Sequence, residues 1–473
     1  MKVIVIGAGP AGVMAAMRAA ELGAKTTLVT RDEFGGMAAN DGPIPVRTLA
    51  HGARLVREAR QLDRYGVTVR EPSLDYPRLL MRVREVVAQV RTHTAFRSDL
   101  ARLGVVIHEH SGTAHFLDPY TVECDQGVRL LGERIILCSG GTSRRLRVPG
   151  SELTATHSDA WLLTSVPRSM IVIGAGATGV QVASIFNAFG SQVHLYQSGP
   201  RILPTEDEDI SQAVAQAFRE SGITVLENFG TIDSFEKTSS GLRMTFSKNG
   251  VRMNDEATVV IVAIGWLADT AGLNLSAAGV QLNDRGYVSV DSYLRTSASH
   301  IFAAGDIRGR LMLLPQATTD GYSAATNAVL GTTMTVDNSV NPIGSFTDPE
   351  YAQVGLSEVK ARETHDVFVS TVSFADAIRP TIDGRTTGFC KLIVDRTNHT
   401  ILGCHIVGER AVEITQMAAI AMGAGMRIED LVRIPLSFPT YTGVFLRAAY
   451  QANCDLRGGA AAGQSPDLLN FAA

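Results

Sequence analysis

The chain contains 473 residues, a length that predicts two large domains or about three smaller ones. Charged residues make up 19%, hydrophobic residues 45%, and the net charge is −4, which disfavours a nucleic-acid surface and a disordered acidic tail. The five cysteines, at positions 124, 138, 390, 404 and 454, lie far apart. This spacing argues against a metal site, a paired redox dithiol or a disulfide scaffold, so we expect no metal and a small-molecule partner.

A membrane span is not expected, because no segment reaches the run of about 18 apolar residues that a spanning helix needs. The N-terminus runs from Val3–Ile6 directly into glycine and shows no basic leader with a cleavage site. A cytoplasmic protein is therefore the expectation.

Two segments of the chain resemble each other. Residues 2–12 read Lys-Val-Ile-Val-Ile-Gly-Ala-Gly-Pro-Ala-Gly, and residues 169–179 read Ser-Met-Ile-Val-Ile-Gly-Ala-Gly-Ala-Thr-Gly. Each continues into a helical pattern and a second apolar run, at 26–29 and 193–196. Strand, glycine turn, helix and strand within about 30 residues predict a dinucleotide-binding unit.

A pyrophosphate needs free backbone N–H groups at a helix N-terminus and no Cβ in its way, which explains three glycines in each copy. The first and third glycines would make the turn and let helix and strand pack, and the second would admit the phosphate. The expected contacts are Gly7, Gly9, Pro10, Ala11 and Gly12 in the first unit, and Gly174, Gly176, Thr178 and Gly179 in the second.

The remaining segments are assigned by their hydrophobic patterns. Residues 51–103 predict a long amphipathic helix, 104–140 short strands, and 224–265 strands that end at Gly265. A buried strand ends at Gly305-Asp306. A β-rich stretch at 388–407 precedes helices at 411–421 and 442–451, and the tail 455–473 is expected to be mobile.

Several further motifs resemble those of the two-dinucleotide-binding flavoproteins, the pyridine nucleotide-disulfide oxidoreductase family of glutathione reductase, dihydrolipoamide dehydrogenase and mercuric reductase. They are Gly35-Gly36 with Ile44-Pro45, Cys138-Ser139-Gly140, Ala263-Ile264-Gly265, Gly305-Asp306, Phe346–Glu350 and Ile401–Gly408. The resemblance implies an α/β fold with two Rossmann-like domains, an FAD domain (1–150 and 266–338) and an NAD(P) domain (151–265). A C-terminal α+β dimerisation domain (339–454) implies a homodimer.

The same resemblance implies which residues meet the cofactors, FAD and NADH or NADPH. Around the flavin it places Gly36, Met37, Arg47, Ser139, Gly140, Gly265, Gly305 and Asp306, with the helix start at Leu314, Pro315, Gln316 and Ala317. Thr30, followed by Arg31, stands where relatives hold the acid that binds the adenosine ribose. In the second unit Gln197, Ser198 and Arg201 occupy the corresponding place, which favours NADH with NADPH tolerated. Asp320, His194, Cys138 and Cys404 are interpreted as structural residues.

The chain departs from the family pattern where the chemistry is done. Ala38 and Pro43 stand at the positions of the two redox cysteines, and Phe438–Gly443 lacks the usual His–Glu pair. An expected Lys–Glu ion pair becomes Arg47 and Gln181. Arg47 keeps a positive charge that would stabilise negative charge on the flavin.

These departures predict an FAD-dependent NAD(P)H:acceptor oxidoreductase without disulfide chemistry. Met37, Ala38 and Pro43, with Phe438 and Tyr441 of the other subunit, would form an apolar slot suited to a quinone-like acceptor. The catalytic candidates are Arg47, Gln181, Phe438 and Tyr441. Three alternatives stay open: a pyridine-nucleotide transhydrogenase, indicated by Ser437–Thr440; a non-catalytic flavoprotein that acts as a sensor or scaffold; and a specialised biosynthetic oxidation or reduction.

Overall fold

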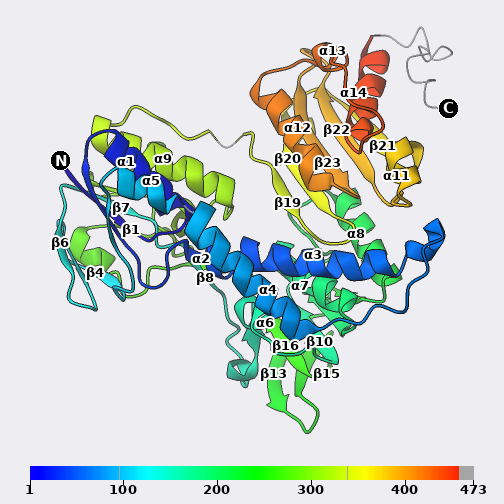
Figure 1. Ribbon diagram of the computed structural model, residues 1–473, viewed down its shortest axis with the longest axis horizontal. Coiled ribbons are helices and arrows are strands. Elements are labelled where there is room, and N and C mark those ends of the chain that lie inside the picture. Colours follow the sequence, from blue (N-terminus) through cyan, green and yellow to red (C-terminus); the bar gives the residue numbers. More distant parts are fainter. Residues whose placement is uncertain (95, 338, 458–473) are drawn as a thin grey trace. The chain divides into compact units, whose positions relative to one another are not determined.

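The computed structural model describes residues 1–94, 96–337 and 339–457 (Figure 1). The chain forms two compact units: the first contains the described residues of 1–147, 155–166 and 262–337, and the second contains 148–154, 167–261 and the described residues from 339 onward. Each unit contains a parallel sheet with a glycine turn and antiparallel strands as well, and the second unit includes the five-stranded antiparallel sheet of the C-terminal region. The α/β fold with a separate C-terminal sheet is confirmed. Most residues of the expected NAD(P) and dimerisation domains fall in the second unit.

The first unit is built on a five-stranded sheet with strand order β18-β7-β1-β2-β3. Its neighbouring strands are parallel, and every residue of the central strand after Lys2 is buried, as expected for a strand covered on both faces. The strands are β1 (Lys2–Ile6), β2 (Lys25–Val29), β3 (Val106–His108), β7 (Arg134–Leu137) and β18 (Ile301–Ala303).

Two helices, α1 (Pro10–Glu21) and α9 (Leu314–Leu330), lie side by side against this sheet (Figure 1). They cross closely because Gly321 has no side chain: a Cβ there would lie 2.1 Å from the carbonyl oxygen of Ala11. Small buried alanines line both helices at the crossing. Helix α9 therefore brings its N-terminal end to the glycine turn that begins α1.

The prediction of one long helix over 51–103 is wrong. Helix α3 ends at Ala59, Gly66 takes a left-handed conformation with φ +74°, and a segment without helix or strand follows. The chain becomes helical again where the Asp75 side chain accepts a hydrogen bond from the Arg78 backbone N–H, 3.0 Å away, an N-cap that starts a new helix. The helical segments are α3 (Pro43–Ala59), η1 (Leu62–Tyr65), α4 (Tyr76–Gln89), η2 (Val90–Thr94) and α5 (Arg97–Arg102).

Shorter elements complete the first unit. An antiparallel sheet is formed by β4, β5 and β6, and β8 pairs with β17. Their bounds are β4 (Ala114–Asp118), β5 (Thr121–Cys124), β6 (Arg129–Leu131), β8 (Gly141–Ser143), β9 (Ala155–Thr156), β17 (Trp266–Ala268), α2 (Gly36–Asn40), α6 (His157–Trp161), η4 (Leu275–Ala278) and η5 (Gly305–Arg308).

The second unit repeats the strand–turn–helix arrangement around its own sheet. Strands β10, β11 and β12 are parallel neighbours, and a three-stranded antiparallel sheet of β13, β14 and β15 follows in sequence. The elements are η3 (Ser151–Leu153), β10 (Ser169–Ile173), α7 (Ala177–Ala188), β11 (Gln192–Gln197), α8 (Glu208–Glu220), β12 (Thr224–Glu227), β13 (Thr231–Lys237), β14 (Leu242–Lys248), β15 (Val251–Ala257) and β16 (Val259–Val262).

The C-terminal sheet has strand order β19-β20-β23-β22-β21 and is antiparallel. Helices α12 and α14 share one apolar core with it, so both predicted helices are confirmed, and α14 extends to Leu456. Residues 458–473 of the predicted mobile tail lie outside the described residues. The elements are β19 (Ile343–Ser345), β20 (Tyr351–Gly355), α10 (Glu358–Thr364), β21 (Val367–Ser373), η6 (Phe374–Asp376), α11 (Ile378–Ile382), β22 (Phe389–Asp395), β23 (Ile401–Val407), α12 (Ala411–Gly423), α13 (Ile428–Leu431) and α14 (Gly443–Leu456).

A buried lysine ties this sheet to the start of α8 within the second unit. The Lys391 Nζ on β22 lies 2.8 Å from an Asp207 carboxylate oxygen, 2.7 Å from one of Asp209 and 3.5 Å from one of Glu358. The Lys391 side chain is only 4% exposed, so its charge is compensated almost entirely by these carboxylates.

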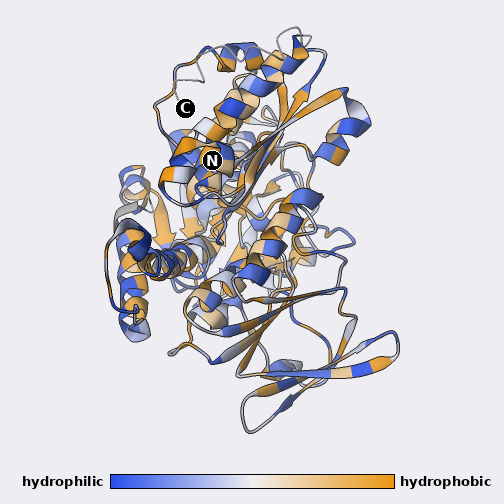
Figure 2. Ribbon diagram, turned by 90° about the vertical axis from the view of Figure 1, so that its right-hand side faces the viewer, coloured by the Kyte–Doolittle hydropathy of each residue, from blue (hydrophilic) through white to orange (hydrophobic). Residues whose placement is uncertain are grey.

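Hydropathy follows this layered plan. Figure 2 shows hydrophobic residues along many of the strands, and hydrophobic and hydrophilic residues mixed along the helices and along β13, β14 and β15 at the bottom of the view. Among the helices in the described part of the chain, none combines the length and apolar character that crossing a membrane requires.

Candidate functional site

The glycine turn of the first unit has a backbone that only glycine supports. Gly7 has φ +104°, and a Cβ there would lie 2.2 Å from the Cys138 carbonyl oxygen. A Cβ at Gly12 would lie 1.7 Å from the Gly7 carbonyl oxygen. Gly9, in contrast, has an ordinary φ of −74° and no protein atom closer than 4.0 Å to a Cβ position. The fold therefore needs Gly7 and Gly12, whereas Gly9 leaves space at the N-terminus of α1, where Pro10 and Ala11 follow.

The second turn has the same division of roles. Gly174 has φ +95°, and a Cβ at Gly179 would lie 1.8 Å from the Gly174 carbonyl oxygen. No atom lies within 4 Å of a Cβ position at Gly176. Thr178 lies half-buried in the first turn of α7. An open space at a helix N-terminus is the feature that a pyrophosphate requires.

The residues expected at the nicotinamide nucleotide's ribose have different partners. The Gln197 side-chain oxygen accepts a hydrogen bond from the Ala175 backbone N–H at 3.0 Å, and its NH2 group lies beside Gly199. The Arg201 guanidinium donates to the carbonyls of Leu203, Pro204 and Glu206. Ser198 is exposed. Gln197 can thus offer a neutral donor, while Arg201 makes three hydrogen bonds within its own loop.

Gly36 lies directly against Gly9. Its φ is +55°, and a Cβ there would lie 2.7 Å from the Gly9 Cα. Met37 and Ala38 follow in α2 and are half-buried, and Met37 accepts backbone hydrogen bonds from Asp41 and Gly42. Two glycines in contact keep the first turn and the start of α2 close together without filling the space at Gly9.

Asp269 connects two loops of the predicted FAD site, although the sequence offered no signal for it. Its carboxylate lies 3.1 Å from Arg31 Nη1, and its carbonyl accepts a 2.6 Å hydrogen bond from Ser139 Oγ. Its backbone N–H also donates to the Gly140 carbonyl. Thr30 is buried, and its backbone pairs with β3. Arg31 and Ser139 are therefore held in place through Asp269.

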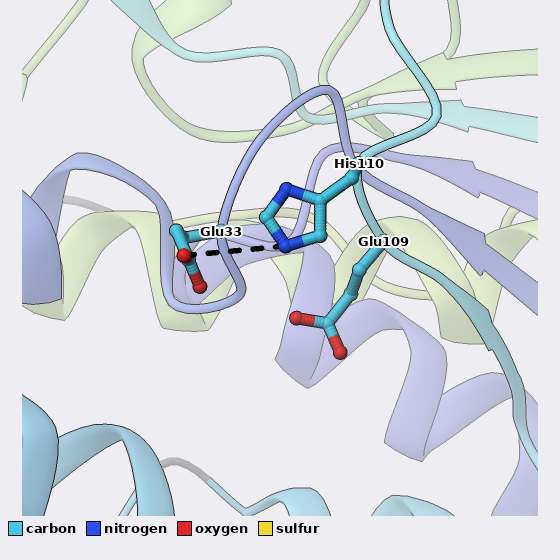
Figure 3. Close-up of side chains that lie close together, drawn as sticks. All are labelled: Glu33, Glu109 and His110. Atoms are coloured by element: carbon cyan, nitrogen blue, oxygen red, sulfur yellow. Dashed lines mark ion pairs between the residues drawn. The ribbon is translucent and has the colours of Figure 1, made fainter. Parts of the chain in front are cut away.

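Three potential metal ligands, Glu33, Glu109 and His110, gather beyond the ends of β2 and β3 (Figure 3). Their ligand atoms lie within 4.8 Å of one another. Arginines already compensate both carboxylates: Arg91 lies 3.3 Å from Glu33, and Arg97 pairs with Glu109. This cluster is thus accounted for as an ion-pair network beside Thr30.

Half-buried Asp306 and fully buried Asp320 form an acidic pair at the Gly-Asp turn. Burial, with a smaller contribution from the Asp320 carboxylate, raises the pKa of Asp306 to about 6. Asp320 accepts hydrogen bonds from the Gly305 N–H at 3.1 Å, from Gln316 at 2.6 Å and from the buried Arg308. The interpretation of Asp320 as structural agrees with these contacts, which join the Gly-Asp turn to α9.

Helix α9 begins at Leu314, as the sequence predicted to within one residue. Pro315 occupies its first turn, Gln316 and Ala317 are buried, and Leu314 is exposed. A Cβ at Gly305 would lie 3.0 Å from the Ala11 side chain. The positive end of the α9 dipole thus lies in the same unit and beside the same turn as α1.

The predicted catalytic residues divide between the two units. Arg47 is exposed on α3 in the first unit, and Gln181 belongs to the second, where its amide donates to the Ala177 carbonyl at 3.0 Å. Phe438 is 67% exposed. The Tyr441 hydroxyl donates to Asp383 at 2.9 Å, and burial raises its pKa. The roles assigned to these four residues stay predictions, as does that of exposed Gly265.

The cysteines include one contact that sequence spacing concealed. Cys390 and Cys404 lie on neighbouring strands β22 and β23, fully buried, and a hydrogen bond between the two thiols raises the pKa of Cys404. Burial likewise raises the pKa of Cys138. Buried thiols of raised pKa are poor nucleophiles, which agrees with the interpretation of Cys138 and Cys404 as packed residues.

Residues 1–321 match the family model described as "Pyridine nucleotide-disulphide oxidoreductase", and residues 341–449 match its dimerisation domain. The chain belongs to the pyridine nucleotide-disulphide oxidoreductase family. The family expected from the sequence is confirmed, and with it a fold of two Rossmann-like domains and a dimerisation domain. Its members are FAD-dependent oxidoreductases that use NAD(P)H.

Relatives match over nearly the whole chain. A dihydrolipoyl dehydrogenase of Mycobacterium tuberculosis (strain ATCC 25618 / H37Rv) is 32% identical over 93% of this chain and 95% of its own. A mercuric reductase of Lysinibacillus sphaericus is 30% identical over 90% of this chain and 78% of its own. The solved HOCl-induced flavoprotein disulfide reductase RclA of Escherichia coli superposes with a TM-score of 0.83 at 25% identity, covering 94% of this chain and 98% of that one.

The geometry of the first unit fits FAD. The space beside Gly9, which a side chain would narrow, lies at the N-terminus of α1, and the half-buried Asp306 carboxylate has no hydrogen-bond partner among the described residues. Gly9, Gly36, Ser139, Gly140 and Asp306 are the residues that would hold the cofactor.

Proposed function

We propose that this protein is an FAD-dependent NAD(P)H:acceptor oxidoreductase that passes electrons to a small, non-disulfide acceptor of quinone-like chemistry. FAD, when bound, supplies the capacity to take a hydride from NAD(P)H and release two electrons to an acceptor. The chain's own residues bind and orient the two nucleotides and shape the acceptor's surroundings.

The observation that carries the proposal is the segment from Gly36 to Pro43, which follows the first glycine turn. Residues 38 and 43 are Ala and Pro, and neither side chain can form a thiolate. Of the five cysteines, Cys124, Cys138, Cys390 and Cys404 are buried and Cys454 lies on α14. The segment therefore has no nucleophile for thiol–disulfide exchange.

Residue chemistry supports a flat, weakly polar acceptor. Met37, Ala38 and Pro43 in one segment and the exposed ring of Phe438 in another present apolar surface. Such surface favours an aromatic or quinoid ligand over a charged thiol. In the proposed function Phe438 and Tyr441 reach this place from the second subunit of a homodimer, an arrangement supported by the dimerisation domain.

The nucleotide roles follow from the two turns. The first would hold the FAD pyrophosphate and the second that of NAD(P)H, with the Gln197 amide at the ribose and Arg47 and Gln181 near the reacting rings. Since Gln197 is neutral, it neither repels a 2′-phosphate nor binds it as a cation would, which supports NADH with NADPH tolerated. A cytoplasmic location stays part of the proposal.

The experiment separates the two half-reactions of the purified holoprotein without oxygen. NADH or NADPH is added first, and bleaching of the visible flavin absorbance reports hydride transfer. The reduced protein is then mixed separately with a benzoquinone, oxidised lipoamide or thio-NADP, and return of the absorbance identifies the acceptor class.

Return of the absorbance with benzoquinone but not lipoamide, unaffected by thiol alkylation, is the expected result. Reoxidation by lipoamide would instead place the protein with the disulfide reductases among its relatives. Reoxidation by thio-NADP alone would indicate a transhydrogenase, the alternative that the sequence Ser437–Thr440 favours. A flavin that stays oxidised with both nucleotides would refute the enzymatic proposal.

A further inference from the structure

A buried histidine faces the Met37–Pro43 segment from within the first unit. His157, the first residue of α6, has a side chain that is only 5% exposed, and its Nε2 lies 3.6 Å from a carboxylate oxygen of Asp41. Asp41 follows α2 and lies between positions 38 and 43. The Asp41 side chain is 32% exposed. The pair therefore links a buried imidazole to a carboxylate that solvent can reach.

Polar and aromatic neighbours fix the orientation of this imidazole. Its Nδ1 lies 2.9 Å from Ser143 Oγ on β8, and Ser158 Oγ lies 3.4 Å from Nε2 and donates to the Asp41 carboxylate at 2.5 Å. The Trp266 ring packs edge-on against it, with ring centroids 4.7 Å apart. Each imidazole nitrogen therefore has a polar neighbour, and the ring can be held in place in either protonation state.

The proposed reaction needs a proton that the acceptor slot does not contain. Reducing a quinone-like acceptor A follows NAD(P)H + H⁺ + A → NAD(P)⁺ + AH2, so one proton enters with each hydride. The side chains of Met37, Ala38, Pro43 and Phe438 carry no acidic hydrogen. The Tyr441 hydroxyl already donates a hydrogen bond to Asp383, and burial raises the pKa of Tyr441.

We propose that His157 and Asp41 form a proton-donating dyad that serves acceptor reduction. This inference rests on the proposed function and names the group that completes it. The proton passes from the His157 imidazolium through the Asp41 carboxylate to an acceptor oxygen as the hydride equivalent arrives, and the imidazole regains one proton from solvent for each turnover. The nicotinamide nucleotide is oxidised and the acceptor is reduced, so charge and hydrogen balance.

The electrostatic surroundings suit such a role. Burial lowers the pKa of His157, while the carboxylates of Asp41 and Asp159 oppose that shift. Asp159 itself is bonded to the Thr156 backbone and hydroxyl as part of a helix cap. The charged groups facing the ring are thus Asp41 and Asp159, and an imidazole beside a carboxylate can both give and regain a proton.

The test compares Asp41→Asn, His157→Gln and a matched control, His115→Gln. His115 also pairs with a carboxylate, Glu123 at 3.5 Å, but lies on β4. In the anaerobic assay we expect His157→Gln to slow acceptor reduction by about 100-fold, a typical contribution of general acid catalysis. Flavin reduction by NADH should change by less than about twofold, and His115→Gln should behave as the unsubstituted protein.

A second readout does not depend on turnover. NMR titration of isotope-labelled histidine in the oxidised holoprotein should show the His157 signal, identified by its loss in His157→Gln, titrating at lower pH in Asp41→Asn. This shift is expected because the substitution removes a carboxylate that stabilises the imidazolium. An unshifted titration would overturn the dyad.

The outcomes separate this inference from the proposed function. If benzoquinone reoxidises the unsubstituted protein and His157→Gln equally fast, the dyad is refuted while the proposed function stands. Equal slowing of both half-reactions would make His157 merely structural and would also overturn the inference. If benzoquinone does not reoxidise the unsubstituted protein, the proposed function fails, and the NMR titration alone decides whether the His157–Asp41 coupling exists.

Discussion

The two glycines Gly176 and Gly179 make a sharp test of the second nucleotide site because the structure assigns them opposite roles. Gly176 has φ −78° and ψ −174°, a conformation open to alanine, and nothing lies within 4 Å of its Cβ position. A Cβ at Gly179 would lie 1.8 Å from the Gly174 carbonyl oxygen. Alanine at 176 should therefore obstruct a ligand, and alanine at 179 should obstruct the fold.

The expected magnitudes follow from these contacts. For Gly176→Ala, an entropic gain of about 0.4–1 kcal/mol in the unfolded chain opposes the loss of a preferred N-cap residue. The free energy of unfolding of Gly176→Ala should then change by less than about 1 kcal/mol. Its new methyl group occupies the space that phosphate oxygens would approach, so NAD⁺ binding should weaken at least about tenfold, or about 1.4 kcal/mol. Gly179→Ala should lose about 1–3 kcal/mol of stability or more, because strand and helix must separate.

Urea unfolding and calorimetric titration with NAD⁺, which leaves the flavin oxidised, measure the two quantities on the same holoprotein. Unchanged NAD⁺ affinity in Gly176→Ala would refute the assignment of this turn to the pyrophosphate. A stability loss in Gly176→Ala as large as that in Gly179→Ala would show that the space at Gly176 is not open.

Three further substitutions test electrostatic features of the second unit. Burial, and secondarily the Asp207 carboxylate, raises the pKa of Glu206 to about 7. Because the folded protein binds this proton more tightly than the unfolded chain, stability should fall as pH rises from about 4.5 through about 7. Glu206→Gln should therefore raise the melting temperature more at about pH 8 than at about pH 5. An equal rise at both pH values would contradict that reasoning. Lys391→Met should lower the free energy of unfolding in urea by about 3–5 kcal/mol because it leaves the Asp207 and Asp209 carboxylates without their cation. Arg243→Met, which removes an exposed partner of Glu256, should lower it by no more than about 1 kcal/mol. Equal losses would show that the Lys391 ion pairs do not contribute as buried pairs. Gln197→Glu should raise KM for NADPH relative to NADH at least about tenfold through repulsion of the 2′-phosphate, and an unchanged ratio would place the ribose elsewhere.

Some features of this protein were predictable because they are local. A glycine with positive φ between an apolar strand and a helix is dictated by backbone sterics within about a dozen residues, and both turns, at Gly7 and Gly174, have that conformation. The helices at 411–421 and 442–451 were likewise predictable, because the spacing of their hydrophobic residues is a local property of the sequence. The prediction of one long helix over 51–103 is wrong because amphipathic helices flank Gly66, Pro72 and the Asp75 cap, which end one helix and start the next within the same pattern.

The sequence by itself determined the family, the two nucleotide turns and the amino acids that stand at positions 38, 43 and 438. Only the tertiary structure decided which distant side chains meet: Asp269 with Arg31, Lys391 with Asp207, and Asp41 with His157. Each of these contacts joins segments far apart in the chain, and their distances depend on how strands and helices pack rather than on any local period. The charge environment, burial and proton affinity of these side chains are therefore properties of the folded chain, whereas the two glycine turns are determined by local sequence.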